Sequence, residues 1–160
     1  SNWKTYINNQ YGFSFKYPKS WLKDGEDVKV TNSSGDVTSI EINFTDAVSN
    51  TKLIIEYHLA PNGSKLYQYA VSQYKSSQGW FSKGGKQIKI AGGKALEATS
   101  IINEDGRGNS ITIPLMSIIV VFLDRKKAGE FELKFTTSLH NNLIETTKFN
   151  KLLSTFKYIN

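Results

Sequence analysis

The chain of 160 residues contains no cysteine, which excludes disulfide bonds, thiolate metal sites and a cysteine nucleophile. No segment approaches the roughly 20 consecutive apolar residues that cross a bilayer. Histidine is scarce as well: His58 and His140 stand far apart, and neither has a zinc-binding spacing such as His-Glu-x-x-His. A Gly-x-Ser-x-Gly turn around a nucleophilic serine is also missing. We expect both histidines to be structural or solvated, and the sequence singles out no catalytic residue, cofactor or metal ligand.

Arginine is rare although the chain is basic. The net charge is +6, yet only Arg107 and Arg125 among the 20 cationic residues carry the planar fork that reads phosphates and guanines. Aromatic residues do not alternate with the basic ones, so the pattern predicts no nucleic-acid binding. The lysines form either a solubilising coat or an attraction to an anionic partner such as a lipid surface.

The densest basic stretch is the candidate for such an attraction. It lacks the spacing of a Walker A loop, but its glycines and lysines are suited to a cationic rim facing an anion or a membrane. The alternative is a structural role, in which the lysines protect an exposed edge strand against pairing with other chains. The candidate residues are Lys83, Lys86, Lys89 and Lys94.

A strong strand pattern lies near the beginning of the chain. Phe13, Phe15 and Tyr17 alternate with polar residues, which is typical of a strand with one buried face. Pro18 ends the ladder because it has no N–H to donate, and Trp21 follows as a large apolar anchor. We interpret Tyr17, Pro18 and Trp21 as a structural signature.

Further strands follow from alternation and from turn residues. The segment Lys52–His58 places Leu53, Ile55 and Tyr57 on one face, and Ile54, Glu56 and His58 on the other. The unbroken apolar run Ile118–Leu123 predicts a strand covered on both faces. The other expected strands are Val28–Thr31, Ser39–Phe44, a strand ending at Ile90, Ala95–Asn103, Ile111–Leu123 and a strand containing Phe131, Leu133 and Phe135.

Two helices are predicted from periodicity. The first begins at Ser64 as N-cap, buries a stripe containing Tyr67 and Tyr74, and ends just before Gly79. The second begins with a capping box formed by Asn142 and Glu145. Its apolar stripe runs through Phe149, Leu152, Leu153 and Phe156.

The segment Asn103–Asn109 faintly resembles a calcium-binding loop, with Gly108 at the sixth position. Arg107 stands where a ligand is needed, and Pro114 replaces the closing glutamate. A plain hairpin loop is therefore the favoured interpretation.

No repeat or linker divides the chain, so we expect one domain over residues 1–160. The order is strands, a helix, more strands and a final helix. It predicts an α+β fold, an α/β/α sandwich with a central, mostly antiparallel sheet flanked by helices.

Three motifs resemble the PsbP/Mog1-like superfamily. They are the aromatic strand Tyr11–Trp21, the turn Gly92-Gly93-Lys94-Ala95, and Ser154-Thr155-Phe156 in the last helix. The resemblance implies the same sandwich. That superfamily includes a photosystem II extrinsic protein, a nuclear Ran-binding factor, secretion chaperones and many prokaryotic lipoproteins, with no shared catalytic chemistry.

From this resemblance we expect a non-enzymatic binding or accessory domain of an exported, lipid-anchored or secreted protein. The chain begins with Ser1-Asn2 rather than methionine, so we expect a leader or anchor to have been removed upstream. The expected partner is an unknown protein or an anionic surface, and the expected state is a monomer without a cofactor. A cytosolic Mog1-like adaptor or chaperone is the alternative, and a small-molecule or metal carrier is the third.

Overall fold

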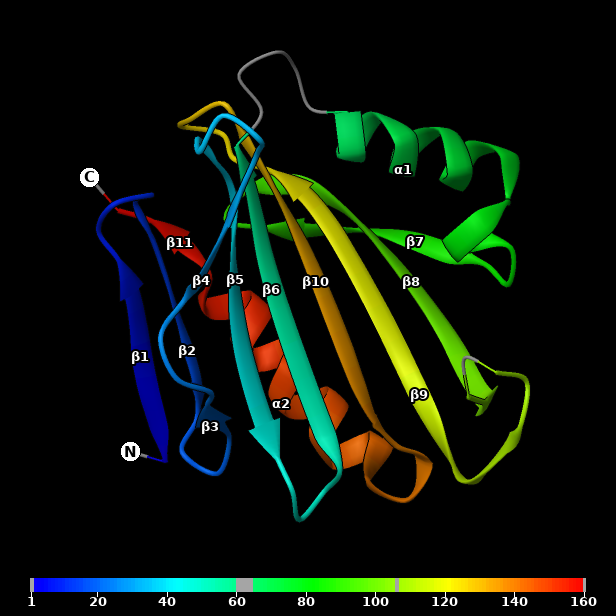
Figure 1. Cartoon of the computed structure of the whole chain (residues 1–160). Helices are drawn as coiled ribbons and strands as arrows, with labels where there is room; N and C mark the ends of the chain where they lie inside the picture. Colours follow the sequence, from blue (N-terminus) through cyan, green and yellow to red (C-terminus); the bar gives the residue numbers. More distant parts are fainter. Residues whose placement is uncertain (1, 60–64, 106, 160) are drawn as a thin grey trace.

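The computed structural model describes residues 2–59, 65–105 and 107–159. Figure 1 shows a large twisted sheet, one helix against each face, and a small sheet beside it. The elements are β1 (Trp3–Asn8), β2 (Phe13–Pro18), β3 (Leu22–Lys23), β4 (Val28–Thr31), β5 (Val37–Asp46), β6 (Thr51–Leu59), α1 (Lys65–Ser76), the 3-10 helix η1 (Gly79–Phe81), β7 (Gly85–Ile90), β8 (Gly93–Glu104), β9 (Ser110–Leu123), β10 (Gly129–Ser138), the 3-10 helix η2 (Leu139–Asn141), α2 (Asn142–Thr155) and β11 (Lys157–Tyr158).

The large sheet confirms the predicted antiparallel architecture. Its strands follow the order β3-β5-β6-β10-β9-β8-β7, with β4 also paired to β5, and the described pairs are antiparallel. The apolar run Ile118–Leu123 lies in the interior strand β9. Val120 and Val121, which point to opposite faces, are both fully buried. The prediction of a strand covered on both faces is therefore confirmed.

The inner face of the large sheet packs against α2 and the small sheet (Figure 1). Alternation along β6 sends Leu53, Ile55 and Tyr57 into this core, as the sequence predicted. Aromatic rings make up much of its volume: Phe13 stacks on Phe156 with ring centroids 5.6 Å apart. Such contacts add to the hydrophobic burial that stabilises the fold.

A small second sheet, which the sequence did not predict, lies beside the central sheet. It has the order β1-β2-β11, and β1, which was absent from the predicted strands, pairs antiparallel with β2. The predicted stripe of the last helix also ended one residue too late: α2 ends at Thr155, and Phe156 is extended. The chain then pairs as β11 with β2, and Phe156, the extended residue between α2 and β11, packs its ring on Phe13.

The first helix lies on the outer face, the face opposite α2. It contributes Ala70 to a second apolar cluster with Phe81 of η1 and the outer-facing side chains Leu96, Ala98 and Val121. These belong to β8 and β9, so α1 covers only that half of the outer face. We call the outer-facing residues of β5, β6 and β10 the open half.

Neither predicted end of the first helix is confirmed by the structure. Ser64 lies outside the described residues. At the other end, α1 stops at Ser76 and Ser77 has the left-handed conformation, with φ 52°. Gly79 therefore opens η1 and does not cap α1, which corrects the prediction.

The prediction of a capping box at the start of α2 is also wrong. Asn142 is already helical, and the N-cap Asn141 makes no side-chain cap hydrogen bond. Glu145 instead turns into the core and accepts a hydrogen bond from the Trp21 indole. Sequence spacing alone does not reveal such a tertiary partner.

Candidate functional site

The open half of the outer face carries a row of charged side chains across three neighbouring strands. In the strand register Glu41 of β5 lies opposite Glu56 of β6, and Glu56 lies opposite Glu132 of β10. Residues two apart on a strand share its face, so His58 and Lys134 belong to this face as well. We call Glu56, His58, Glu132 and Lys134 the outer-face polar cluster.

Close contacts join the members of the outer-face polar cluster. His58 Nε2 lies 3.2 Å from Glu56 Oε2 and 3.9 Å from Glu132 Oε2. Lys134 Nζ lies 3.1 Å from Glu56 Oε1 and 3.5 Å from Glu132 Oε1. The two carboxylates therefore turn one oxygen toward the imidazole and the other toward the ammonium.

Burial and charge shift the pKa values in this cluster in opposite directions. The adjacent His58 imidazole, with help from Lys134, lowers the pKa of Glu56 to about 2. Burial raises the pKa of Glu132, and the charge of Lys134 opposes this only in part. Burial also disfavours the Lys134 ammonium, but Glu56 and Glu132 together outweigh it and raise the pKa of Lys134. Unequal environments of two neighbouring carboxylates are a common mark of functional sites.

Two polar atoms of the cluster lack hydrogen-bond partners within the described residues. Glu132 Oε1 and His58 Nε2 are buried and form no hydrogen bond with the described residues. The 3.2 Å approach of His58 to Glu56 is thus an electrostatic contact that is poorly directed for hydrogen bonding. Such atoms are costly to bury unless something satisfies them.

Glu130, two residues before Glu132 on the same face of β10, holds the first helix in place. Glu130 accepts hydrogen bonds from the backbone N–H groups of Leu66 (3.0 Å) and Tyr67 (2.7 Å). A carboxylate at a helix N-terminus satisfies otherwise unpaired N–H groups and interacts favourably with the helix dipole. Glu130 therefore anchors α1 beside the cluster and is not itself free to bind a ligand.

The four lysines proposed as one patch do not lie together. Lys83 precedes β7, and Lys86 pairs with Glu97 at 2.9 Å. Lys89 lies opposite Lys94 in the strand register, three positions along from Lys86, so Lys86 points to the other face. β7 is the last strand in the order of the large sheet, which agrees with the alternative of a lysine-protected edge.

Two depressions flank these lysines. One of about 360 Å³ is lined by Tyr67, Gly92, Gly93, Lys94, Leu123 and Arg125. The other, of about 330 Å³, is lined by Lys83, Gly84, Gly85, Lys86, Glu97 and Thr99. Because Lys86 and Lys94 line different hollows, the candidate patch is divided.

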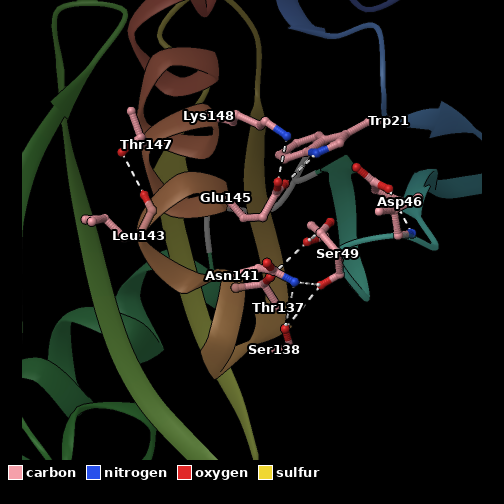
Figure 2. A network of polar contacts seen from close by, with 12 residues as sticks. Trp21, Asp46, Ser49, Thr137, Ser138, Asn141, Leu143, Glu145, Thr147 and Lys148 are labelled. Carbon is pink, nitrogen blue, oxygen red and sulfur yellow. Dashed lines mark hydrogen bonds and ion pairs between the residues drawn. The ribbon is translucent and has the colours of Figure 1, made fainter. Parts of the chain in front are cut away.

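The structural signature lies in the core. Tyr17 packs on Phe44 with ring centroids 4.7 Å apart, and Pro18 closes β2 opposite Trp3. Figure 2 shows the indole of Trp21 directed at Glu145, with its Nε1–H donating to Oε2 over 2.9 Å. Trp21 thus links α2 to the core, while Tyr17 and Pro18 connect β2 to β5 and β1, and all three residues have structural roles.

The remaining candidates stay apart from the cluster. His140 is exposed in η2, beyond the far end of β10 from His58. In the loop resembling a calcium site, the Asp105 carboxylate accepts hydrogen bonds from the backbone of Arg107 and from Asn109. This side chain therefore stabilises a hairpin between β8 and β9, as the favoured interpretation predicted.

The sequence did not single out the outer-face polar cluster. Alternation already placed Glu56 and His58 on one face of a strand, and that was the available signal. Glu132 and Lys134 join them only through the pairing of β6 with β10, two strands that are far apart in the chain.

Comparisons with known proteins define the fold class. No family model matches the chain, and no curated protein is similar to it in sequence. Solved structures do match over the whole length. A Bacteroides thetaiotaomicron crystal structure has a TM-score of 0.61 at 14% identity; it aligns with all of this chain, which spans half of that longer protein.

Two further solved structures match almost end to end. Cyanobacterial PsbP (CyanoP) of Synechocystis has a TM-score of 0.58 at 12% identity, covering 98% of this chain and 92% of that one. LpqN of Mycobacterium tuberculosis, involved in cell envelope biogenesis, has a TM-score of 0.58 at 12% identity, covering 100% and 93%. The chain therefore has the PsbP-like fold, as its aromatic strand and glycine turn indicated.

The two helices are short. Within the described residues, none is long and apolar enough to cross a membrane.

Proposed function

We propose that this domain is a non-enzymatic accessory or binding module that works outside the cytoplasmic membrane. The observation that carries the proposal is the PsbP-like fold. One protein that shares this fold, LpqN, is involved in cell envelope biogenesis, and another is a cyanobacterial PsbP. The lysine-rich surface and the lack of cysteine are compatible with that location.

The open half of the outer face is the proposed binding surface. Its β5 and β6 side chains remain partly exposed, since α1 packs over β8 and β9. Polar and charged groups on a rigid sheet suit recognition of a partner protein or an anionic surface, because the strands hold them in fixed positions.

The first test is the intact mass and N-terminal sequence of the native protein isolated from its source cells. A cleaved leader or a lipid-modified cysteine upstream of Trp3 is the expected result. An N-terminus that still carries its initiator methionine would overturn the proposed location.

A second experiment tests the surface. A photo-crosslinking residue at Lys52, which is exposed on the outer face of β6, should capture a partner in living cells. The same residue at Asn150, exposed on α2, is the matched control. Equal capture from both positions would contradict the assignment of the open half.

The alternative of a cytosolic adaptor has one observation in its favour. Leu143 and Ile144, in the first turn of α2, are 78% and 63% exposed, and exposed apolar side chains often mark protein contacts. An unprocessed N-terminus together with crosslinks from Leu143 would support this function over an extracytoplasmic one.

A further inference from the structure

Three potential metal ligands converge on the outer face. His58, Glu56 and Glu132 each offer one ligand atom, and these atoms lie within 4.8 Å of one another. They come from adjacent strands whose register places Glu56 directly opposite Glu132. The positions are therefore fixed by the centre of the sheet and not by a loop.

The spacing is close to that of a coordinated cation. Zinc binds imidazole nitrogen and carboxylate oxygen at about 2.0–2.2 Å, so neighbouring ligand atoms lie about 3.0–3.5 Å apart. His58 Nε2 lies 3.2 Å from Glu56 Oε2 and 3.9 Å from Glu132 Oε2. All three ligand atoms lie within 4.8 Å of one another, so rotamer changes of the two carboxylates by roughly 1 Å would bring them to the spacing of a coordinated ion.

A second observation points to a missing ligand. The Glu132 side chain is only 6% exposed; its Oε2 faces His58 at 3.9 Å, while its Oε1 lies 3.5 Å from Lys134 Nζ. His58 Nε2 is buried beside it and has no hydrogen-bond partner within the described residues. A buried imidazole nitrogen that has no hydrogen-bond partner and faces two carboxylate oxygens forms a site of the kind that a cation satisfies.

The local charge agrees with a dication. Glu41, Glu56 and Glu132 form one row across three strands, and like charges in such positions repel one another. Lys134 offsets one of the three negative charges, which leaves two when His58 is neutral. A divalent cation would neutralise the row.

We propose that Glu56, His58 and Glu132 bind a divalent transition-metal cation of the zinc class. One imidazole and two carboxylates suit Zn²⁺ better than the all-oxygen set preferred by Ca²⁺ or Mg²⁺. The Oε2 atoms and Nε2 face the ion, while Lys134 stays on the Oε1 side as an outer charge partner. Three protein ligands leave a further position for water or for a group of a partner.

The proposal is independent of where the protein resides, so the tests of cellular location neither support it nor contradict it. The direct measurement is titration of the metal-free protein with Zn²⁺ at pH 7 by calorimetry, with Co²⁺ absorption as a probe of ligand geometry. We expect one ion per chain and a Zn²⁺-dependent rise in melting temperature, since an ion that binds only the folded state stabilises it.

Matched variants identify the ligands. His58→Ala and Glu132→Gln should each weaken Zn²⁺ binding at least about 10-fold, since even outer-shell changes cost that much. His140→Ala is the control: it removes the other, exposed histidine and should leave binding unchanged. Circular dichroism establishes that each variant is folded, and Glu132→Gln keeps the shape of the side chain if His58→Ala does not fold.

Lys134 supplies a test that adventitious surface binding does not pass. Its side chain is 38% exposed, so it is replaceable, and Lys134→Gln removes the cation that competes for both carboxylates. Zn²⁺ should then bind more tightly. The proposal is overturned if the wild type binds no zinc, if His140→Ala abolishes binding, or if Lys134→Gln weakens it as much as His58→Ala does.

Discussion

Removing Glu145 tests whether a single buried hydrogen bond fastens the last helix to the sheet. Trp21 and Glu145 are 1% and 2% exposed, and the indole N–H donates to the carboxylate over 2.9 Å. The other carboxylate oxygen lies 2.6 Å from Lys148 Nζ. Glu145→Ala deletes the acceptor for both groups at once.

The expected cost follows from what each partner does afterwards. Lys148 is partly exposed and becomes hydrated in the variant, so the loss of its ion pair with Glu145 contributes little to the destabilisation. The Trp21 N–H stays buried without an acceptor, and this penalty together with the lost charged hydrogen bond is about 3 kcal/mol. A domain of this size loses about 2–4 °C per kcal/mol, so the melting temperature should fall by about 6–12 °C.

The assay is urea unfolding followed by far-ultraviolet circular dichroism, with calorimetry for the melting temperature. Glu145→Gln keeps an acceptor oxygen for the indole and should cost about 1 kcal/mol. Asn150→Ala, an exposed position on the same helix, is the control and should stay within about 0.5 kcal/mol of the wild type.

A double-mutant cycle decides the cause. In a Trp21→Phe background the indole donor is already gone, so Glu145→Ala should cost about 1–2 kcal/mol less than it does in the wild type. An identical cost in both backgrounds would refute the reasoning, because the loss would then arise from packing and not from the hydrogen bond.

Three further outcomes are expected. Glu130→Ala removes the carboxylate at the start of α1. The free energy of opening that helix should fall by about 1 kcal/mol, so hydrogen–deuterium exchange of its amides should accelerate roughly fivefold. In an NMR titration, the hydrogen bonds from Asn109 should hold the pKa of Asp105 below its usual value, and Asn109→Ala should raise it. Because that pKa is lowered in the folded state, the loop's stabilisation is present above the usual value and is lost as the pH falls through the folded one. Tyr57→Phe removes the hydroxyl that donates to Asp124 over 2.9 Å, and unfolding in urea should show a loss of about 1–2 kcal/mol.

The local hydrophobic pattern of the sequence was sufficient to predict most of the strands and helices. Alternation along β6 assigned each of its side chains to the correct face, and the apolar run in β9 correctly indicated cover on both faces. Hydrophobic periodicity succeeds in such cases because the side chains of a strand alternate whatever the strand packs against. The antiparallel sheet and the two helices followed from the same signals.

The predictions failed where a tertiary partner outweighed local chemistry. Glu145 has the spacing of a helix cap, yet the Trp21 indole binds its carboxylate in the core. Phe156 continues a helical stripe, yet the chain leaves the helix there to pair with β2. In both cases burial against a distant segment contributes more free energy than the local preference, which is about 1 kcal/mol.

For the outer-face polar cluster, too, local pattern determined one part and tertiary structure the other. By itself the sequence determined that Glu56 and His58 share one face of a strand, because the two-residue repeat is a property of the backbone. Only the tertiary structure decided that Glu132 and Lys134 lie beside them, since strand register depends on how whole hydrophobic faces match across the sheet. It also decided that α1 covers β8 and β9 and leaves this cluster on the open half, because the position of a helix depends on the apolar surface available to it.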